Sequence, residues 1–214
     1  MIACQQNSIL LLTGEKSIQE AVWARIKGET RNRCFARGDF ADLGSRLAVS
    51  QALSRMERAG LLVSPLRGYY CRPRISKLLG ESLPPDYGCL AEAIARNEGW
   101  SIIPCGDILL NDMGLSTQVP VVWSYVSSGP YRNYDAQGTV ISFKHTANRE
   151  MFCLSLVSAK VVQVLKTLGA DHVDDLVLER LRGKLSAKDL KVVLSETSRV
   201  TSWIYDAIRK LAGG

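Results

Sequence analysis

The side chains best suited to chemistry in this sequence are polar and cationic groups spaced along one predicted helix, residues 45–59. Arg and Gln can each form two hydrogen bonds to the edge of a base, and Arg also binds phosphate oxygens. The polar face of this helix carries Arg46, Ser50, Gln51, Ser54, Arg55 and Arg58. Only Glu57 adds negative charge there, so the residue types and their spacing favour recognition of double-stranded DNA.

The elements around this face are typical of a helix-turn-helix. Ser45 can cap the helix through its hydroxyl, and Gly60 can end it in a left-handed conformation. The opposite face is apolar at spacings of three and four residues, with Val49, Ala52, Leu53 and Met56. A shorter helix is predicted at residues 37–43, and a Gly-containing turn joins the two helices.

A wing is predicted directly after the long helix. Residues 61–63 and 69–71 have the composition of short strands, and the turn between them contains Pro65 and Gly68. Arg67 lies at the tip of this hairpin, and Tyr69 begins its second strand. Helix pair, turn, hairpin and positive charge together predict a winged helix-turn-helix that binds DNA. The alternative is an ordinary helical subdomain with a solvated basic face.

The distribution of charge separates the two parts of the chain. The sequence has 214 residues and a net charge of +6. Residues 1–78 hold 13 Lys and Arg against 6 Asp and Glu, whereas residues 79–214 hold 14 against 15. The whole basic excess therefore belongs to the segment with the predicted helix-turn-helix, which favours binding of a polyanion by that segment.

The remaining sequence predicts a second domain of mixed structure. A diproline at residues 84–85 marks a boundary after a linker at 73–85. Helices are predicted at 87–97, 107–113 and 152–168, with three more caps or starts at Asp174, Ser186 and Thr201. Strands are predicted at 100–104, 119–126, 131–135 and 140–144, with the second of them central because its apolar run is nearly continuous. We therefore predict an α+β fold: a winged helix-turn-helix domain at residues 1–78, and at residues 86–214 a mixed α/β domain with a helical C-terminal part.

The sequence shows no motif that is typical of an enzyme, a metal site or a membrane-spanning protein. His145 and His172 have no catalytic motif around them, and Asp174 with its acidic neighbours fits the start of a helix. The six cysteines form no C-x-x-C pair, so we expect reduced core residues of a cytoplasmic protein. The apolar run at residues 8–12, within an N-terminal arm at 1–14, is too short to span a membrane. We expect no enzymatic activity, cofactor, metal or membrane contact.

One polar turn in the second domain is not explained by these rules. It comprises Gly114, Leu115, Ser116, Thr117 and Gln118, followed by Val119 and Pro120. Composition alone favours a helix end that leads into a strand. Together with the segments 39–55 and 67–70, and with Tyr125, Ser128 and Gly129 after it, this stretch resembles the AbiEi-like antitoxins of type IV toxin–antitoxin systems. The resemblance covers about residues 17–205.

That resemblance implies a function for each domain. The N-terminal domain would bind and repress its own promoter, and the C-terminal domain would counter a nucleotidyltransferase-like toxin, usually without a tight complex, in abortive infection. Carried over by position, the DNA-facing residues are those of the polar helix face with Arg67 and Tyr69 on the wing, and antitoxicity belongs to the region 106–120. Two alternatives stay open: a winged-helix regulator whose second domain senses a small ligand, and an adaptor that contacts proteins.

Overall fold

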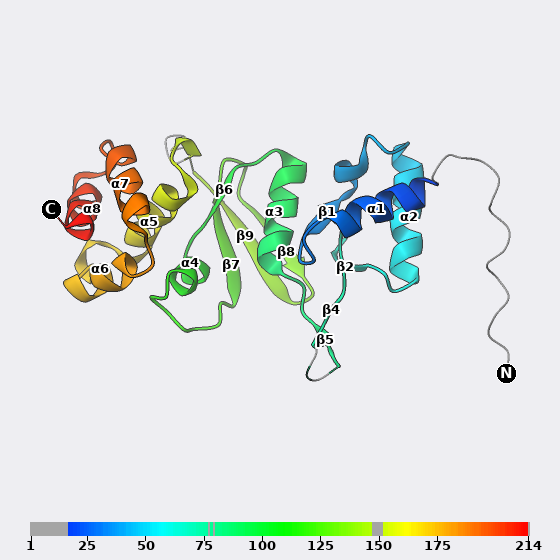
Figure 1. Cartoon of the computed structure of the whole chain (residues 1–214), viewed down its shortest axis with the longest axis horizontal. Helices are drawn as coiled ribbons and strands as arrows, with labels where there is room; N and C mark the ends of the chain where they lie inside the picture. The colour runs from blue at the N-terminus through cyan, green and yellow to red at the C-terminus, as the bar shows by residue number, and fades with distance from the viewer. Residues whose placement is uncertain (1–16, 77, 79, 147–151, 214) are drawn as a thin grey trace.

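The computed structural model describes residues 17–76, 78, 80–146 and 152–213 and has an α+β architecture, as predicted (Figure 1). Its described elements are arranged in three parts along the long axis. Helices and a small sheet form the N-terminal part, a four-stranded sheet with one covering helix forms the centre, and a group of helices forms the C-terminal part. The predicted arm at residues 1–14 lies outside the described residues.

Three helical segments enclose the N-terminal core: α1 (Ile18–Gly28), the 3-10 helix η1 (Arg37–Phe40) and α2 (Arg46–Arg58). Helix α1 begins with a capping box. The Glu20 N–H donates to Ser17 Oγ at 3.2 Å, and the Ser17 N–H donates to Glu20 Oε2 at 3.1 Å. The core between these helices is apolar and comprises Val22, Ile26, Phe35, Phe40, Val49, Ala52, Leu53, Met56, Leu62 and Tyr70.

The predicted helix at residues 37–43 is shorter than expected, because only the four residues of η1 are helical. The bonds in and after it run from i+3 to i, as from the Ala41 N–H to Gly38 O and from the Leu43 N–H to Phe40 O. Such bonds close tight turns and are seldom sustained beyond a few residues. The segment therefore turns into α2 without completing an α-helix.

A three-stranded antiparallel sheet follows the helices, in the order β1-β3-β2. It contains β1 (Cys34–Ala36), β2 (Val63–Leu66) and β3 (Tyr69–Cys71). The strand predicted at 61–63 begins two residues late, because the N–H groups of Leu61 and Leu62 donate to Met56 O and close the end of α2. Strand β1 was not predicted, because its three residues are all buried and therefore show no alternation of apolar and polar side chains.

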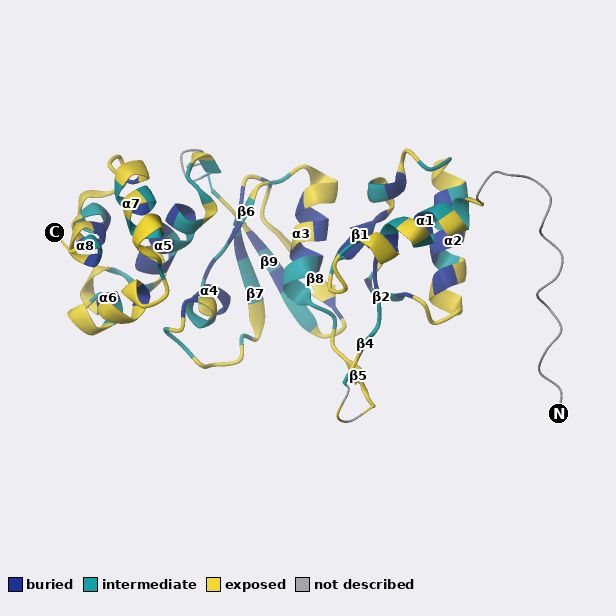
Figure 2. Cartoon of the chain, viewed as in Figure 1, coloured by how far each residue is buried: buried dark blue, intermediate teal, exposed yellow. Residues whose placement is uncertain are grey.

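The two faces of this sheet are buried by different partners. Phe35 and Tyr70 point into the N-terminal core, whereas Cys34, Ala36 and their neighbours on the other face pack on α3 (Tyr87–Glu98). The same apolar cluster continues into the central sheet through Phe143. The described parts on either side of the predicted boundary thus share one core, as the buried residues in Figure 2 illustrate.

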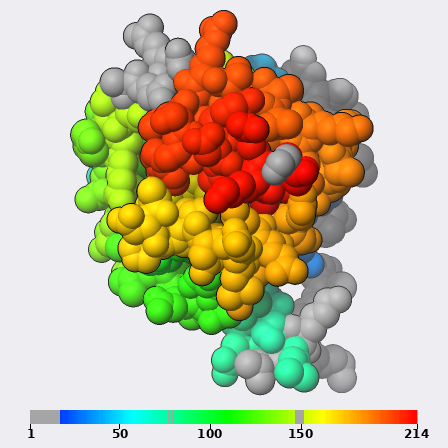
Figure 3. Space-filling model, turned by 90° about the vertical axis from the view of Figure 1, so that its left-hand side faces the viewer, coloured from blue at the N-terminus to red at the C-terminus, as the bar shows by residue number. Residues whose placement is uncertain are grey.

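The predicted linker at 73–85 contains secondary structure. Strands β4 (Arg74–Ile75) and β5 (Ser82–Leu83) pair in an antiparallel hairpin that projects from the rest of the molecule (Figures 1 and 3). Two residues in each strand are too few for a periodic signal. The hairpin leads to Asp86, whose carboxylate accepts from the Cys89 N–H and caps α3.

The central sheet has the four predicted strands, in the order β6-β7-β9-β8. They are β6 (Ile102–Pro104), β7 (Val122–Ser127), β8 (Arg132–Ala136) and β9 (Thr139–His145), with β7 and β9 parallel and the other pairs antiparallel. Strand β7 is interior, as predicted, but it begins at Val122, where pairing with Val140 of β9 begins. The side chains of Val119 and Val121 are 88% and 83% exposed, so the first part of the predicted strand lies outside the sheet.

The C-terminal part is helical, as predicted. It contains α5 (Leu156–Leu168), the 3-10 helix η3 (Ala170–His172), α6 (Asp175–Arg182), α7 (Ala187–Glu196) and α8 (Ser202–Ala212), and α4 (Asp107–Asp112) packs against α5. Figure 3 shows these helices covering one end of the molecule. Helix α5 begins at Leu156, not at the predicted Phe152, because the Ser155 hydroxyl caps it.

Cys34, Cys71, Cys89 and Cys105 are free thiols, as predicted, and all of them except Cys89 are buried. Cys153 is exposed, so it is not the core residue that was expected, and Cys4 lies outside the described residues. Within the described ranges, no helix combines the length and apolar character needed to cross a membrane.

Candidate nucleic-acid interface

Helix α2 is fixed at both ends and along one face. The Ser45 hydroxyl accepts from the Ala48 N–H at 3.3 Å, as the sequence predicts, and Gly60 follows the helix with a φ of 71°. The predicted apolar residues of α2 are buried against α1 and η1. This packing leaves the opposite, polar face of the helix toward solvent.

An ion pair sets the position of the turn before α2. Arg25 of α1 donates from both terminal nitrogens to the Asp42 carboxylate, each at 2.6 Å, and also to Asp39 O at 2.9 Å. The hydrogen bonds from Arg25 lower the pKa of Asp42 to about 2. These bonds attach α1 to the turn that sets the direction of α2.

The predicted residues of α2 do not all point the same way. Gln51 and Arg58 are exposed near the centre of the outward face, Arg46 lies on the flank beside the hairpin, and Arg55 lies on the flank beside α1. Ser54 is partly buried on the outward face. The hydroxyl of Ser50, also partly buried, donates to Arg46 O at 2.8 Å.

Leu47 is a residue of this face that the sequence reasoning missed. Its side chain is 69% exposed and lies at the centre of the outward face, among the polar residues. The signal was available, because Leu47 falls outside the apolar spacing formed by Val49, Ala52, Leu53 and Met56. Apolar side chains on such a face can contact the 5-methyl group of thymine.

Of the two hairpin residues predicted to face DNA, one is exposed and the other is buried. Arg67 is exposed at the turn between β2 and β3, and Gly68 permits that turn with a φ of 86°. Tyr69 is only 7% exposed, and its hydroxyl accepts from the Asn97 side-chain amide at 3.4 Å. Burial raises the pKa of Tyr69 to about 12. Tyr69 therefore belongs to the contact with α3, which corrects its predicted position on the outer surface of the wing.

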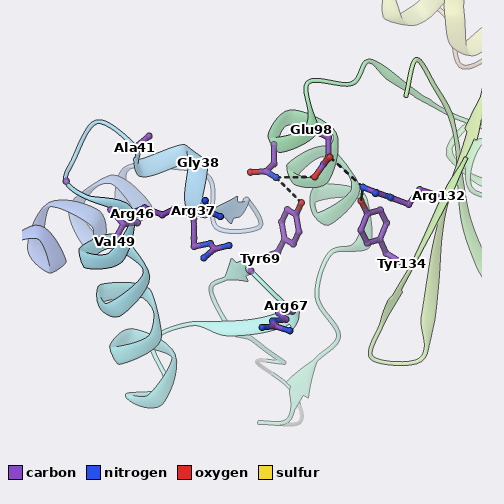
Figure 4. Close-up of a pocket in the computed structure, with 13 residues that line it drawn as sticks. Arg37, Gly38, Ala41, Arg46, Val49, Arg67, Tyr69, Glu98, Arg132 and Tyr134 are labelled. Atoms are coloured by element: carbon purple, nitrogen blue, oxygen red, sulfur yellow. Dashed lines mark hydrogen bonds and ion pairs between the residues drawn. The ribbon is translucent and has the colours of Figure 1, made fainter. Parts of the chain in front are cut away.

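A groove of about 620 Å³ lies between α2, the hairpin and β8 (Figure 4). Arg37 of η1, Arg46 of α2, Arg67 of the hairpin and Arg132 of β8 line it, each from a different element. Glu98 is the one carboxylate among the lining residues, and its Oε2 lies 3.6 Å from an Arg132 nitrogen. Three more guanidinium groups than carboxylates meet here, so the groove is strongly cationic.

The two parts that form the groove are joined by Arg96 of α3. Its guanidinium donates to both Asp39 carboxylate oxygens, at 2.8 and 2.9 Å, and to Cys34 O at 2.9 Å. The carboxylate also accepts from the Ala36 N–H at 2.8 Å. Burial alone would raise the pKa of Asp39, but the hydrogen bonds from Arg96 and Ala36 outweigh it and lower that pKa. Arg96 was not predicted as an important residue.

The predicted antitoxicity segment forms a compact turn after α4. Gly114 has a φ of 70°, Leu115 packs against the C-terminal core, and Ser116 Oγ accepts from the Gln118 N–H at 3.2 Å. The Asn111 side-chain amide donates to Gln118 O. Thr117 and Gln118 are exposed, together with Val119. The local hydrogen bonds match the expected helix end, and the segment lies apart from the cationic groove.

The acidic and imidazole groups considered for chemistry are used locally. Asp174 accepts from the Val177 N–H at 2.8 Å and caps α6, as expected. His145 Nδ1 lies 2.8 Å from Gly129 O. Among the residues with described positions, no group of three or more His, Cys, Asp or Glu is arranged to hold a metal ion.

Fold and surface define an α+β protein with a cationic groove beside an exposed helix. Residues 21–193 match the family described as "Family of unknown function (DUF6088)", and the chain belongs to that family. A search of curated proteins gives no match. Among solved structures, the chain is similar to the RV2827C protein from Mycobacterium tuberculosis, with 19% identity, a TM-score of 0.45, and coverage of 92% of this chain and 77% of that chain.

Proposed function

We propose that this protein binds double-stranded DNA through a winged helix-turn-helix in its N-terminal part. Helix α2 is the recognition helix and enters a major groove, and the β2–β3 hairpin is the wing that contacts the backbone. The observation that carries this assignment is a set of exposed arginines that form no ion pair with any described residue: Arg46, Arg55, Arg58 and Arg67.

Three other arginines have structural partners instead. Arg25, Arg33 and Arg96 each hold a carboxylate within 2.8 Å, and so have structural partners. The arginines of α2 and the hairpin have no such partner among the described residues. An unpaired cationic surface does not stabilise the fold, so these charges are available to bind an anion. Phosphate oxygens are the partners that such a surface fits, and binding would release counterions.

On the resemblance to AbiEi-like antitoxins, we extend this proposal to the operon. The DNA is the protein's own promoter, which it represses, and the second part counters a nucleotidyltransferase-like toxin without a requirement for a tight complex. The exposed Thr117 and Gln118 are the residues we assign to that second activity. Their separation from α2 fits two independent activities in one chain.

The DNA assignment is tested by fluorescence anisotropy with a duplex from the region upstream of the gene. Arg58→Gln and Arg55→Gln should each weaken binding. The loss should be about 1–3 kcal/mol if the arginine contacts a base, whereas loss of a phosphate contact should mainly reduce the dependence of affinity on salt. Arg199→Gln is the matched control, because it removes the same charge from an exposed position near the other end of the chain. Equal affinity and equal salt dependence in all four proteins would refute the placement of α2.

The antitoxin assignment is tested by co-expressing the full chain with the product of the adjacent gene. The full chain is required, because residues 79–214 alone would lose the apolar partners of α3. We expect the neighbour to stop growth, the wild type to restore it, and the Thr117→Ala/Gln118→Ala double variant to fail. The Arg58→Gln variant should still restore growth. A harmless neighbour would remove the antitoxin assignment and favour a ligand-responsive regulator.

A further inference from the structure

The far wall of the cationic groove is formed by β8, which belongs to the central sheet and not to the N-terminal part. Strand β8 packs beside β2 of the hairpin, so Arg132 faces the same groove as Arg37, Arg46 and Arg67 (Figure 4). No pattern in the sequence connects Arg132 with the arginines before residue 78. Only the packing of the two sheets brings these guanidinium groups together.

Arg132 is held in place by aromatic side chains. Its guanidinium carbon lies 5.9 Å from the ring centroids of both Trp100 and Tyr134, and a terminal nitrogen donates to Tyr134 Oη at 3.3 Å. Its side chain is nevertheless 50% exposed. A guanidinium has five N–H donors, and Arg132 uses one of them in the hydrogen bond to Tyr134 and lies 3.6 Å from Glu98, so most of its donors are left to a ligand.

Contacts within the chain hold the walls of the groove relative to one another. Arg96 ties α3 to η1 and β1 through Asp39 and Cys34 O, and the shared apolar cluster packs the small sheet on α3. The walls therefore keep their relative position without a ligand, and binding does not have to order them. Preorganisation of this kind reduces the entropic cost of association.

We propose that β8 takes part in DNA binding, with Arg132 and the arginines of α2, η1 and the hairpin forming one continuous groove for the phosphodiester backbone. This step rests on the proposed function, since it requires that α2 and the hairpin bind a duplex. It extends that function, because the second part of the chain then contributes directly to DNA affinity. A duplex backbone fits better than a compact anion, since Arg46 and Arg67 lie on the two elements assigned to DNA and Arg37 lies on the segment that precedes α2.

The test measures affinity for the upstream duplex by anisotropy at several salt concentrations, with the full chain. Arg132→Gln should reduce the slope of log K against log salt by about 1, the value for one lost phosphate contact. Arg132→Lys should keep that slope, which separates the loss of charge from the loss of packing on Trp100. Glu98→Gln should raise affinity several-fold, because it removes the carboxylate from the path of the phosphates. Arg199→Gln is again the control for net charge.

The outcomes distinguish this inference from the proposed function. A wild-type protein without salt-dependent duplex binding would overturn both. Normal binding and slope in Arg132→Gln, together with weakened binding in Arg46→Gln and Arg67→Gln, would overturn only the role of β8. Direct binding of inorganic tripolyphosphate that is lost in Arg132→Gln, with an unchanged duplex slope, would identify a small-anion site and would also overturn it.

Discussion

Arg96 connects the N-terminal part to the rest of the molecule, and its removal should destabilise the protein measurably. Its guanidinium makes three charge-assisted hydrogen bonds, to both Asp39 carboxylate oxygens and to Cys34 O. The Asp39 side chain is 15% exposed and the Arg96 side chain 36%. Substitution by Met keeps the aliphatic stem of Arg96 but leaves Asp39 without its cationic partner.

The expected loss follows from these contacts. Hydrogen bonds to charged groups contribute about 1.5–3 kcal/mol when they are shielded, and solvent around the partly exposed guanidinium reduces that value. We expect Arg96→Met to lower the free energy of unfolding by about 2 kcal/mol. For a chain of this size that is a fall in Tm of about 4–8 °C.

Urea and thermal unfolding of the single and double variants with Asp39→Asn would measure the coupling. The two substitutions should be clearly non-additive, because each removes the same contact. Asp112→Asn, which breaks the solvated ion pair with Lys160, is the control and should change stability by less than about 0.5 kcal/mol. A loss below about 0.5 kcal/mol in Arg96→Met, or simple additivity with Asp39→Asn, would refute the role of Arg96.

The pH dependence of this pair has a defined sign. Because the hydrogen bonds lower the pKa of Asp39 in the folded protein, its contribution is fully present above the unfolded carboxyl pKa of about 3.9. It is lost as the pH falls through the lower folded pKa. The difference in stability between the wild type and Asp39→Asn should therefore shrink below about pH 4 and stay constant above about pH 5.

Three further predictions concern single positions. Gly129→Ala should destabilise the protein by about 1–3 kcal/mol in urea unfolding, because the new Cβ would clash with the Trp100 ring; an unchanged midpoint would show that the ring can move. Ser17→Ala removes the cap of α1 and should cost about 1 kcal/mol in the same assay, whereas Ser17→Asp should restore most of the loss. Leu47→Ala should weaken DNA binding about fourfold for a contact that buries one methyl group. Replacing the contacted thymine by uracil should abolish the difference in affinity between the wild type and Leu47→Ala. Equal effects of the substitution on both duplexes would exclude a methyl contact.

The helices of this protein are largely local in origin, and the sequence located most of them, apart from the segment 37–43 and the start of α5. Caps such as Ser17, Ser45 and Asp174 satisfy N–H groups of their own first turn, so their effect does not depend on distant residues. The same holds for Gly99, whose φ of 71° ends α3 where the sequence placed it. The polar face of α2 was likewise predictable, because a spacing of three and four residues determines which side chains share a face.

Strand limits and side-chain direction depended on partners that are remote in the sequence. The apolar run from Val119 predicts a strand, yet β7 begins at Val122, because the pairing with β9 begins there. Tyr69 could have faced either side of the hairpin, and the position of Asn97 on α3 decided that it is buried. Alternate residues of a strand point to opposite faces whatever their type, so only the packing around the sheet decides which faces are buried.

The sequence by itself determined the α+β class, the helices with their caps, and the concentration of positive charge before residue 78. The tertiary structure alone decided that Arg132 lies with Arg46 and Arg67 in one groove, and that Arg96 holds its walls together. The physical reason is that propensity and capping act over a few residues, whereas the groove exists only because one apolar cluster packs the small sheet against α3 and the central sheet.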